Sequence, residues 1–347
     1  MRIAIVTDAW HPQVNGVVRT LTSVTGKLLT GGHVVQIVAP DQFRTVAAPS
    51  YPEIRLALAG ASSVGKRIEQ FAPDSIHIAT EGPLGWAARR WCLRKGLPFT
   101  TAYHTQFPQY LARRTRISAR AFWPAIRRFH APAARVMVAT ETVREELLEQ
   151  GLTQLHHWSR GVDTQVFHPD HAPPDAMLGL PRPIQLYVGR VAVEKNIEAF
   201  LGNSHPGAKV VVGDGPALRS LREEFPNALF LGHRSGADLA ACYAAADVFV
   251  FPSRTDTFGL VMIEAMASGT PVAAYPVSGP RDILSAGSGA MAERLEDAIA
   301  EAVSFERRDC LAAGEAFSWE ASARQFLDGL EPVAKDYPAH GFAPAAA

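Results

Sequence analysis

One acidic residue stands in unusual surroundings near the carboxyl end of the chain. Glu264 is the only charged residue between Thr257 and Pro280, and its neighbours are Leu, Val, Met, Ile and Ala. A lone carboxylate in so apolar a segment must find strong hydrogen-bond donors or lose its charge. Two interpretations follow: a capped or locally paired glutamate, or a carboxylate that binds sugar hydroxyls beside a phosphate site.

Two cations stand where a strand is expected to give way to a helix. Residues 184–189 have the apolar pattern of a buried strand, Arg190 follows it, and Lys195 lies at the start of the next helix. Because helix N-termini attract anions, Arg190 and Lys195 could clamp a diphosphate there. Gly16 has a comparable place in the first half, between a strand and a helix over 17–29, although a plain turn explains it equally well.

A histidine also falls at the end of an expected strand. His104 follows the run Phe99–Tyr103, and Asp8 and Glu81 end two other strand-like runs of the same half. Ligands of open α/β sheets bind at the carboxyl ends of strands. An imidazole there can donate or accept a hydrogen bond near neutral pH. A loop histidine without a special role is the alternative.

The elements that must position these residues alternate in type. Around Glu264 the pattern predicts a strand over 247–252, a loop carrying Asp256, a helix over 258–267 and a new strand from 270, which is one parallel βαβ unit. The same alternation recurs in both halves. We therefore expect two Rossmann-like, doubly wound domains over 1–167 and 184–317, a Pro-rich linker over 168–183, and a helix within 318–340 that packs back on the first domain. The tail from 339 is expected to be disordered.

Composition limits the class of protein. The 347 residues suit about two domains, and 47% hydrophobic with 20% charged residues is ordinary for a globular protein. No apolar run reaches the ~20 residues of a transmembrane helix, and the start lacks the apolar core of a signal peptide. Cys92, Cys242 and Cys310 have neither metal nor redox spacing. These features favour a cytoplasmic location.

The formal charge of zero hides two halves of opposite sign. Residues 1–165 hold 20 Lys and Arg against 11 Asp and Glu, a net of +9, so the remaining residues carry −9. No acidic residue stands between Glu81 and Glu141, and the densest basic part of that gap is 111–130. Arginines interleaved with aromatic residues suit an anionic membrane surface, a solvated basic face is the alternative, and no motif for nucleic acid accompanies them. The candidate contact residues are Arg113, Arg114, Arg116, Arg120, Trp123, Arg127 and Arg128.

Several motifs together resemble one family of glycosyltransferases. They are Pro12–Thr20, Tyr103-His104-Thr105, Arg160–Asp163, Gly189–Lys195, Gly213–Pro216, and Asp256 with Glu264 eight positions later. In this order they are similar to the retaining GT4 family, whose GT-B fold sets two Rossmann-like domains on either side of a cleft. The resemblance covers nearly the whole chain, about Met1 to Leu330. It extends to bacterial enzymes that glycosylate diacylglycerol-type lipids and to mannosyltransferases of phosphoinositide lipids.

The resemblance implies roles for the candidate residues. His104, Asp256 and Glu264 would be catalytic: His104 at the donor sugar near the reacting carbon, Asp256 at the sugar, and Glu264 at the nucleotide ribose. Arg190 and Lys195 would neutralise the diphosphate leaving group in place of a metal, so neither a cofactor nor a metal is expected. The remaining donor-binding residues would be Gly16, Gly215, Thr257, Phe258, Gly259 and Leu260.

One departure affects the donor. The family usually has Glu where this chain has Asp256, and the shorter side chain reaches less far. The expected partners are a nucleotide sugar, a lipid acceptor and an anionic membrane surface at the inner face of the cell membrane, where the protein would be peripheral. We first expect UDP-glucose or UDP-glucuronate as donor, with a GDP-mannose-dependent alpha-mannosyltransferase as the alternative. A nucleotide-sugar epimerase and a non-catalytic ligand-binding protein are alternatives from other classes.

Overall fold

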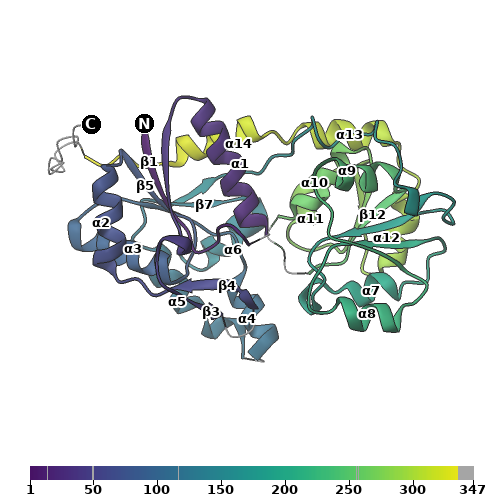
Figure 1. Ribbon diagram of the computed structural model, residues 1–347, viewed down its shortest axis with the longest axis horizontal. Coiled ribbons are helices and arrows are strands. Elements are labelled where there is room, and N and C mark those ends of the chain that lie inside the picture. Colours follow the sequence, from purple (N-terminus) through teal and green to yellow (C-terminus); the bar gives the residue numbers. More distant parts are fainter. Residues whose placement is uncertain (14, 49–50, 116, 255, 257, 335–347) are drawn as a thin grey trace.

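The computed structural model describes residues 1–13, 15–48, 51–115, 117–254, 256 and 258–334, without the side chains at 51–53, 110, 111, 113 and 114. It contains two six-stranded parallel sheets, each covered by helices on both faces, so the expected pair of α/β domains is confirmed (Figure 1). The first domain carries an additional antiparallel hairpin, β3 with β4, which the sequence pattern did not reveal.

The first sheet has the strand order β2-β1-β5-β6-β7-β8. The strands of this half are β1 Arg2–Val6, β2 Val34–Val38, β3 Thr45–Ala48, β4 Tyr51–Ala57, β5 Ser75–Ile78, β6 Thr100–Ala102, β7 Arg135–Val138 and β8 Leu155–His157. The helices are α1 Gly16–Thr30, α2 Ala61–Phe71, α3 Pro83–Lys95, α4 Phe107–Thr115, α5 Trp123–His130 and α6 Glu141–Glu149.

The second sheet has the order β11-β10-β9-β12-β13-β14. Its strands are β9 Gln185–Val188, β10 Lys209–Val212, β11 Leu229–Gly232, β12 Val248–Phe251, β13 Val272–Ala274 and β14 Gly289–Met291. The helices are α7 Ile197–Leu201, α8 Leu218–Glu224, α9 Gly236–Ala245, α10 Leu260–Ala267, α11 Pro280–Ile283, α12 Leu295–Ala302, α13 Arg307–Glu315 and α14 Trp319–Gly329. Every residue of β9 and β12 is buried, as strands covered on both faces require.

The order of each sheet reverses direction in the middle, and that reversal positions the site. In the second sheet β9 and β12 are neighbours, although the chain between them forms β10 and β11 on the other side. The loops that follow β9 and β12 therefore leave in opposite directions and open a crevice between them. Arg190 and Lys195 follow β9, and Asp256 follows β12, so the expected ligand residues lie at this switch point.

The carboxy-terminal helix returns to the first domain. In Figure 1, α14 (yellow) runs beside α1 (purple), far in sequence from its neighbours. Phe326 of α14 is fully buried beside Trp158, whose indole N–H donates to Ser322 Oγ at 3.1 Å. The end of the expected 318–340 segment and the expected disordered tail lie outside the described residues.

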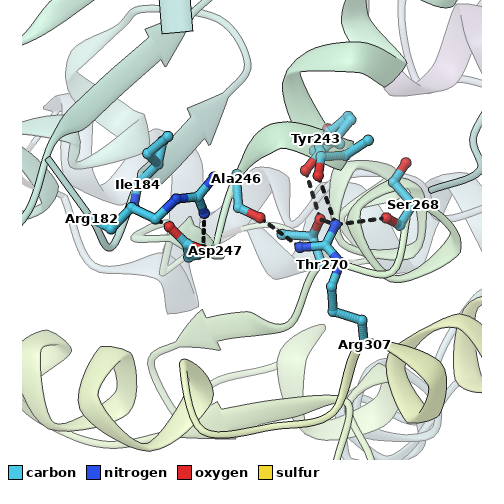
Figure 2. Close-up of polar contacts among 9 residues, drawn as sticks. Arg182, Ile184, Tyr243, Ala246, Asp247, Ser268, Thr270 and Arg307 are labelled. Carbon is cyan, nitrogen blue, oxygen red and sulfur yellow. Dashed lines mark hydrogen bonds and ion pairs between the residues drawn. The ribbon is translucent and has the colours of Figure 1, made fainter. Parts of the chain in front are cut away.

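Arg307 ties the elements of the second domain together at the edge opposite the switch point. Its guanidinium donates to Ala244 O at 2.7 Å and Ala246 O at 2.9 Å, at the end of α9, and to Ser268 O at 3.3 Å, at the end of α10. Figure 2 shows the guanidinium between Ala246 and Ser268. A cation at helix C-termini satisfies carbonyls that have no helical partner and opposes the helix dipoles. This contact holds α10, which carries Glu264, against its neighbours.

Helix α10 begins two residues later than expected, and the basic segment holds two separate helices. The helix expected from Phe258 begins at Leu260, because Gly259 adopts a left-handed φ of 93° that ends the preceding loop. In the basic segment, Pro124 occupies the first turn of α5, and α4 and α5 are separate helices. The basic segment therefore forms no single continuous helix.

Replacing Gly314 by Ala should destabilise the second domain. A Cβ at Gly314 of α13 would lie 2.3 Å from the backbone nitrogen of Ala267, so α13 would have to move away from α10. Overpacking of this kind costs about 1–3 kcal/mol, which urea or thermal unfolding would measure.

Gly26→Ala is the matched control. Apart from its chain neighbours and the backbone of its own helix, no described atom lies within 4 Å of the Cβ position of Gly26 in α1. Replacing a helical glycine should therefore stabilise the protein by roughly 0.5–1 kcal/mol. Equal unfolding midpoints for the two variants would contradict the tight contact between α13 and α10.

Candidate active site

The expected cations and Asp256 meet at the carboxyl edge of the second sheet. Lys195 Nζ lies 2.6 Å from Asp256 Oδ1, and both side chains are 26% exposed. Arg190 pairs with Glu194, four residues on. Burial raises the pKa of Asp256, but Lys195, Ser253 and Arg190 outweigh burial and hold that pKa below its ordinary value. The switch point thus holds an ionised carboxylate beside two cations.

Glycines bring the loops of this edge into contact. Gly213, with a φ of 145°, follows β10, and a Cβ there would lie 1.9 Å from Gly189 O. Gly215 has a φ of 156°, and its Cβ would lie 2.3 Å from Val191 O. Close backbone packing therefore requires glycine at Gly215 irrespective of any ligand. Its expected part in donor binding remains a prediction.

The loop that leads into α10 is held from both sides. Phe258 is 6% exposed and meets Phe317 edge-on, with 6.0 Å between ring centroids. A Cβ at Gly279 would lie 2.9 Å from Phe258 O and 3.1 Å from Asp256 O, so the Gly279 loop braces the other side. The Phe258 ring is therefore an anchor, and only its backbone is placed to meet a ligand. Thr257 lies outside the described residues.

Glu264 is buried and paired. It is 2% exposed on α10, its Oε1 lies 2.5 Å from Arg19 Nη1, and the hydroxyl of Tyr243 donates to its Oε2 at 3.1 Å. Burial raises the pKa of Glu264, and Arg19 and Tyr243 offset part of that rise. Tyr243 belongs to α9 of the same domain, but Arg19 belongs to α1 of the other one. The carboxylate thus links the two domains.

Two helix N-termini meet beside this ion pair. Asn15 caps α1 by accepting hydrogen bonds from Val17 N and Val18 N, both at 3.0 Å. A Cβ on Gly16 would lie 3.9 Å from Leu260 Cδ1, in the first turn of α10. Figure 1 shows α1 passing beside the second domain near α10 and α11. First-turn N–H groups lack helical partners, so both helices offer donors at one place.

A pocket of about 340 Å³ lies between the domains next to Glu264. Its wall combines Arg19 of α1, the segment 161–167, Gly236 at the start of α9, Glu264, and Trp319 of α14. The pocket therefore depends on both domains and on both segments that cross between them. Its volume suits a small polar ligand.

His104 lies under the carboxyl edge of the first sheet. Arg160 Nη2 is 3.1 Å from His104 Nδ1, and the imidazole stands edge-on to Trp158 with 5.5 Å between ring centroids. Burial lowers the pKa of His104 well below its usual range, and Arg160, His77 and His130 lower it further. His104 is therefore a neutral imidazole at physiological pH.

The two acidic residues expected at strand ends of the first sheet, Asp8 and Glu81, have partners within the first domain. Asp8 accepts hydrogen bonds from Leu84 N at 2.8 Å and Gly85 N at 3.2 Å, which caps the start of α3. Glu81 lies 3.2 Å from His130 Nε2. Asp8 thus serves the fold of the first domain.

The basic segment is only partly a surface. Arg120, Arg127 and Arg128 are exposed. Trp123 is 6% exposed and packs in the core, where its ring stacks on Tyr103 with 6.3 Å between centroids. The prediction that Trp123 contacts a membrane is wrong, because the helical period of α5 turns Trp123, Ile126 and Phe129 inward and the arginines outward. Arg116 and the side chains of Arg113 and Arg114 lie outside the described part of the chain.

Three residues of the site were missed from the sequence: Arg19, Tyr243 and Arg160. Arg19 lies one turn into α1 after Gly16. Its position just after the glycine loop was the feature of the sequence that could have indicated a ligand contact. Tyr243 gave no signal beyond its helical spacing. Arg160 stood inside a recognised motif without an assigned role. All three pair with a predicted residue through contacts between distant segments.

Two further findings concern metals and membranes. The described residues include no group of three or more His, Cys, Asp or Glu placed to hold a metal ion. Within the same ranges, no helix is long and apolar enough to cross a bilayer.

Comparison with known proteins matches both domains. Residues 14–166 match the family described as Glycosyltransferase Family 4, and residues 182–305 match Glycosyl transferases group 1. A GDP-mannose-dependent alpha-mannosyltransferase of Mycobacterium tuberculosis (strain CDC 1551 / Oshkosh) is 32% identical over 96% of this chain and 97% of its own. An alpha-monoglucosyldiacylglycerol synthase of Streptococcus pneumoniae (strain ATCC BAA-255 / R6) is 28% identical over 79% of this chain and 71% of its own.

A solved structure agrees with the arrangement. Sucrose-phosphate synthase from Thermosynechococcus elongatus, 23% identical, superposes with a TM-score of 0.75 over 94% of this chain and 97% of its own. The GT-B fold expected from the motifs is thereby confirmed. By its two matched halves and its full-length relative, this chain belongs to glycosyltransferase family 4.

Proposed function

We propose that the protein transfers a hexosyl unit from a nucleoside-diphosphate sugar to a hydroxyl of a membrane lipid, with retention of configuration at the reacting carbon. The observation that carries this proposal is the meeting of the α1 and α10 N-termini, with Gly16 3.9 Å from Leu260 when a Cβ is built on it. Two positive helix ends face one place, and Arg190 and Lys195 lie at the same sheet edge. A diphosphate satisfies that concentration of donors and positive charge.

The same groups would act on the leaving diphosphate. As the bond between the sugar and the phosphate breaks, negative charge grows on the phosphate oxygens. Lys195, Arg190 and the first-turn N–H groups of α10 are fixed in place before the reaction, so they stabilise that charge without reorganisation. This supports transfer without a metal ion.

The donor we favour is GDP-mannose. Our first expectation from the motifs was UDP-glucose or UDP-glucuronate, with GDP-mannose as the alternative. The relative that is 32% identical over nearly the full length of both chains is named for GDP-mannose, which favours the alternative. Glu264 would bind the ribose beside Arg19, and Asp256 and His104 would bind the sugar.

The acceptor side lies in the first domain. Arg120, Arg127 and Arg128 are exposed, and Ile117 and Val46 are apolar and 51% and 44% exposed. Figure 1 places the β3–β4 hairpin, α4 and α5 toward the same end of this domain. Cations with apolar side chains among them suit the headgroup region of an anionic bilayer. The name of one relative, an alpha-monoglucosyldiacylglycerol synthase, supports a lipid acceptor. We place this acceptor at the inner face of the cell membrane.

The central test is incubation with GDP-mannose, UDP-glucose and UDP-glucuronate, each with a membrane lipid extract, followed by mass spectrometry of the lipids. We expect one hexose mass added to a lipid from GDP-mannose, and loss of most transfer in folded His104→Ala and Glu264→Gln variants. Lipid products from a UDP-sugar alone would overturn the donor, and near wild-type turnover in both variants would overturn the site. Release of free sugar or a C2 epimer from the donor alone would favour an epimerase. Donor binding without any product would favour a non-catalytic protein.

Gly16→Ala should impair turnover more than folding. Outside the backbone of α1 and the residues next to Gly16 in the chain, Leu260 Cδ1 at 3.9 Å is the one described atom within 4 Å of the Cβ position, so the described polypeptide leaves room. A diphosphate between these helix ends would meet the new methyl group, and a displacement near 1 Å typically lowers kcat/KM about 100-fold. Gly26→Ala on the same helix is the control. Wild-type kcat/KM for Gly16→Ala would contradict a diphosphate at this place.

Binding to anionic liposomes should be electrostatic. Each Lys or Arg near such a surface contributes about 1 kcal/mol, and the contribution is screened by salt. We expect sedimentation with anionic vesicles to weaken as salt rises, and to weaken at fixed salt in Arg127→Gln/Arg128→Gln. Arg219→Gln/Arg308→Gln, on the second domain, is the control pair. Salt-insensitive binding, or equal loss in both pairs, would argue against docking through the first domain.

A further inference from the structure

Arg160 is a buried cation whose position is fixed by its own chain segment. It is 5% exposed, and its Nη1 donates to Trp158 O at 2.6 Å and to Ser159 O at 3.2 Å. The guanidinium also lies over the Trp158 ring, 4.4 Å from the centroid. No carboxylate among the described residues lies within ion-pair distance of it. Burying an unpaired charge lowers the stability of the fold, so a stabilising ion pair does not explain why an arginine is buried at this position.

The other terminal nitrogen of the guanidinium, Nη2, contacts His104. Arg160 Nη2 is 3.1 Å from His104 Nδ1. An arginine has five N–H donors and no acceptor, so Nδ1 must accept this hydrogen bond. A neutral imidazole carries a single N–H, which must then be on Nε2. Arg160 therefore decides which nitrogen of His104 holds the proton.

We propose that Arg160 is a positioning residue that holds His104 as the Nε2–H tautomer, so that His104 meets the donor sugar only as a hydrogen-bond donor. This inference rests on the proposed function for the sugar contact, but the tautomer itself does not. With Nδ1 engaged by Arg160 and Nε2 protonated, the imidazole has no lone pair to take a proton from the acceptor hydroxyl. His104 therefore orients the sugar and is not a general base.

The surroundings of His104 support a fixed, neutral ring. The titratable and charged groups that face it are Arg160 after β8, His77 on β5 and His130 on α5, and His130 is in turn 3.2 Å from Glu81. Burial, then Arg160, then the two histidines oppose a second proton on His104. Removing the Arg160 charge would take away the largest of the charge effects.

The first experiment needs no substitution in Arg160 and no substrate. In protein with ¹⁵N-labelled histidine, the His104 ring signals are identified by their loss in His104→Gln and followed from pH 8 to pH 5.5. We expect the Nε2–H tautomer throughout. An Nδ1–H tautomer, or protonation of the ring within this range, would overturn the proposal.

The second experiment compares Arg160→Met with Arg160→Lys in transfer assays from pH 5.5 to pH 8. Removing an outer partner that orients a functional side chain typically lowers activity by roughly 10- to 100-fold. We expect such a loss of kcat/KM in Arg160→Met at pH 8, where the neutral ring can adopt the Nδ1–H tautomer, and recovery toward pH 5.5, where a second ring proton restores Nε2–H. Arg160→Lys, which keeps a charged donor, should recover part of the activity at pH 8.

Arg222→Met is the matched control. Arg222 also lies over an aromatic ring, 5.6 Å from the centroid of Phe230, and donates to the Phe230 carbonyl at 3.3 Å, but it lies outside the site. The Arg222→Met substitution should leave kcat/KM and its pH profile unchanged. A pH profile for Arg160→Met that matches wild type would show a purely structural arginine and overturn the proposal. If no donor is turned over by wild type, the proposed function fails, and the ring spectra still decide the tautomer.

Discussion

The two domains are joined by the ion pair between the buried carboxylate of Glu264 and Arg19. Glu264 is 2% exposed on an apolar helix, and the cation within ion-pair distance in the described part of the chain is Arg19, from the other domain. Approach of the domains therefore supplies the counter-charge that burial demands. In the proposed binding mode, a ribose on Glu264 would have to share or replace the Arg19 contact, which would couple donor binding to the relative position of the domains. The opposite net charges of the two halves favour the same approach.

The fold makes this coupling possible through one geometric rule used twice. Each sheet reverses its strand order in the middle, and at each reversal a loop leads into the N-terminus of a helix. In the first domain that helix is α1, and in the second it is α10. Facing positive helix ends repel one another unless an anion lies between them. The fold is thus arranged around the charge of the ligand that we propose.

The sequence allowed both sheets and much of the site to be predicted, because strand-loop-helix alternation places Lys195 and Asp256 at the ends of neighbouring strands. It could not reveal Arg19 beside Glu264, since that contact depends on how two separate domains meet. The β3–β4 hairpin was missed because its strands form no part of either parallel alternation. Trp123 was misplaced because alternating arginine and aromatic residues were taken as one surface, although their helical spacing separates a buried face from an exposed one.

Each of the three candidate catalytic side chains is engaged so that it binds charge or hydroxyls rather than moving protons. Asp256 is held ionised by Lys195, and its lowered pKa makes it a weak base. Glu264 has one oxygen on Arg19 and the other on Tyr243. His104 has Nδ1 on Arg160 and its proton on Nε2. A hydroxyl that attacks the sugar must still lose its proton, and the departing phosphate oxygen is the strongest base created at the site during transfer. In the proposed transfer, attack from the face that the phosphate leaves would bring the two together, which is the geometry that retains configuration.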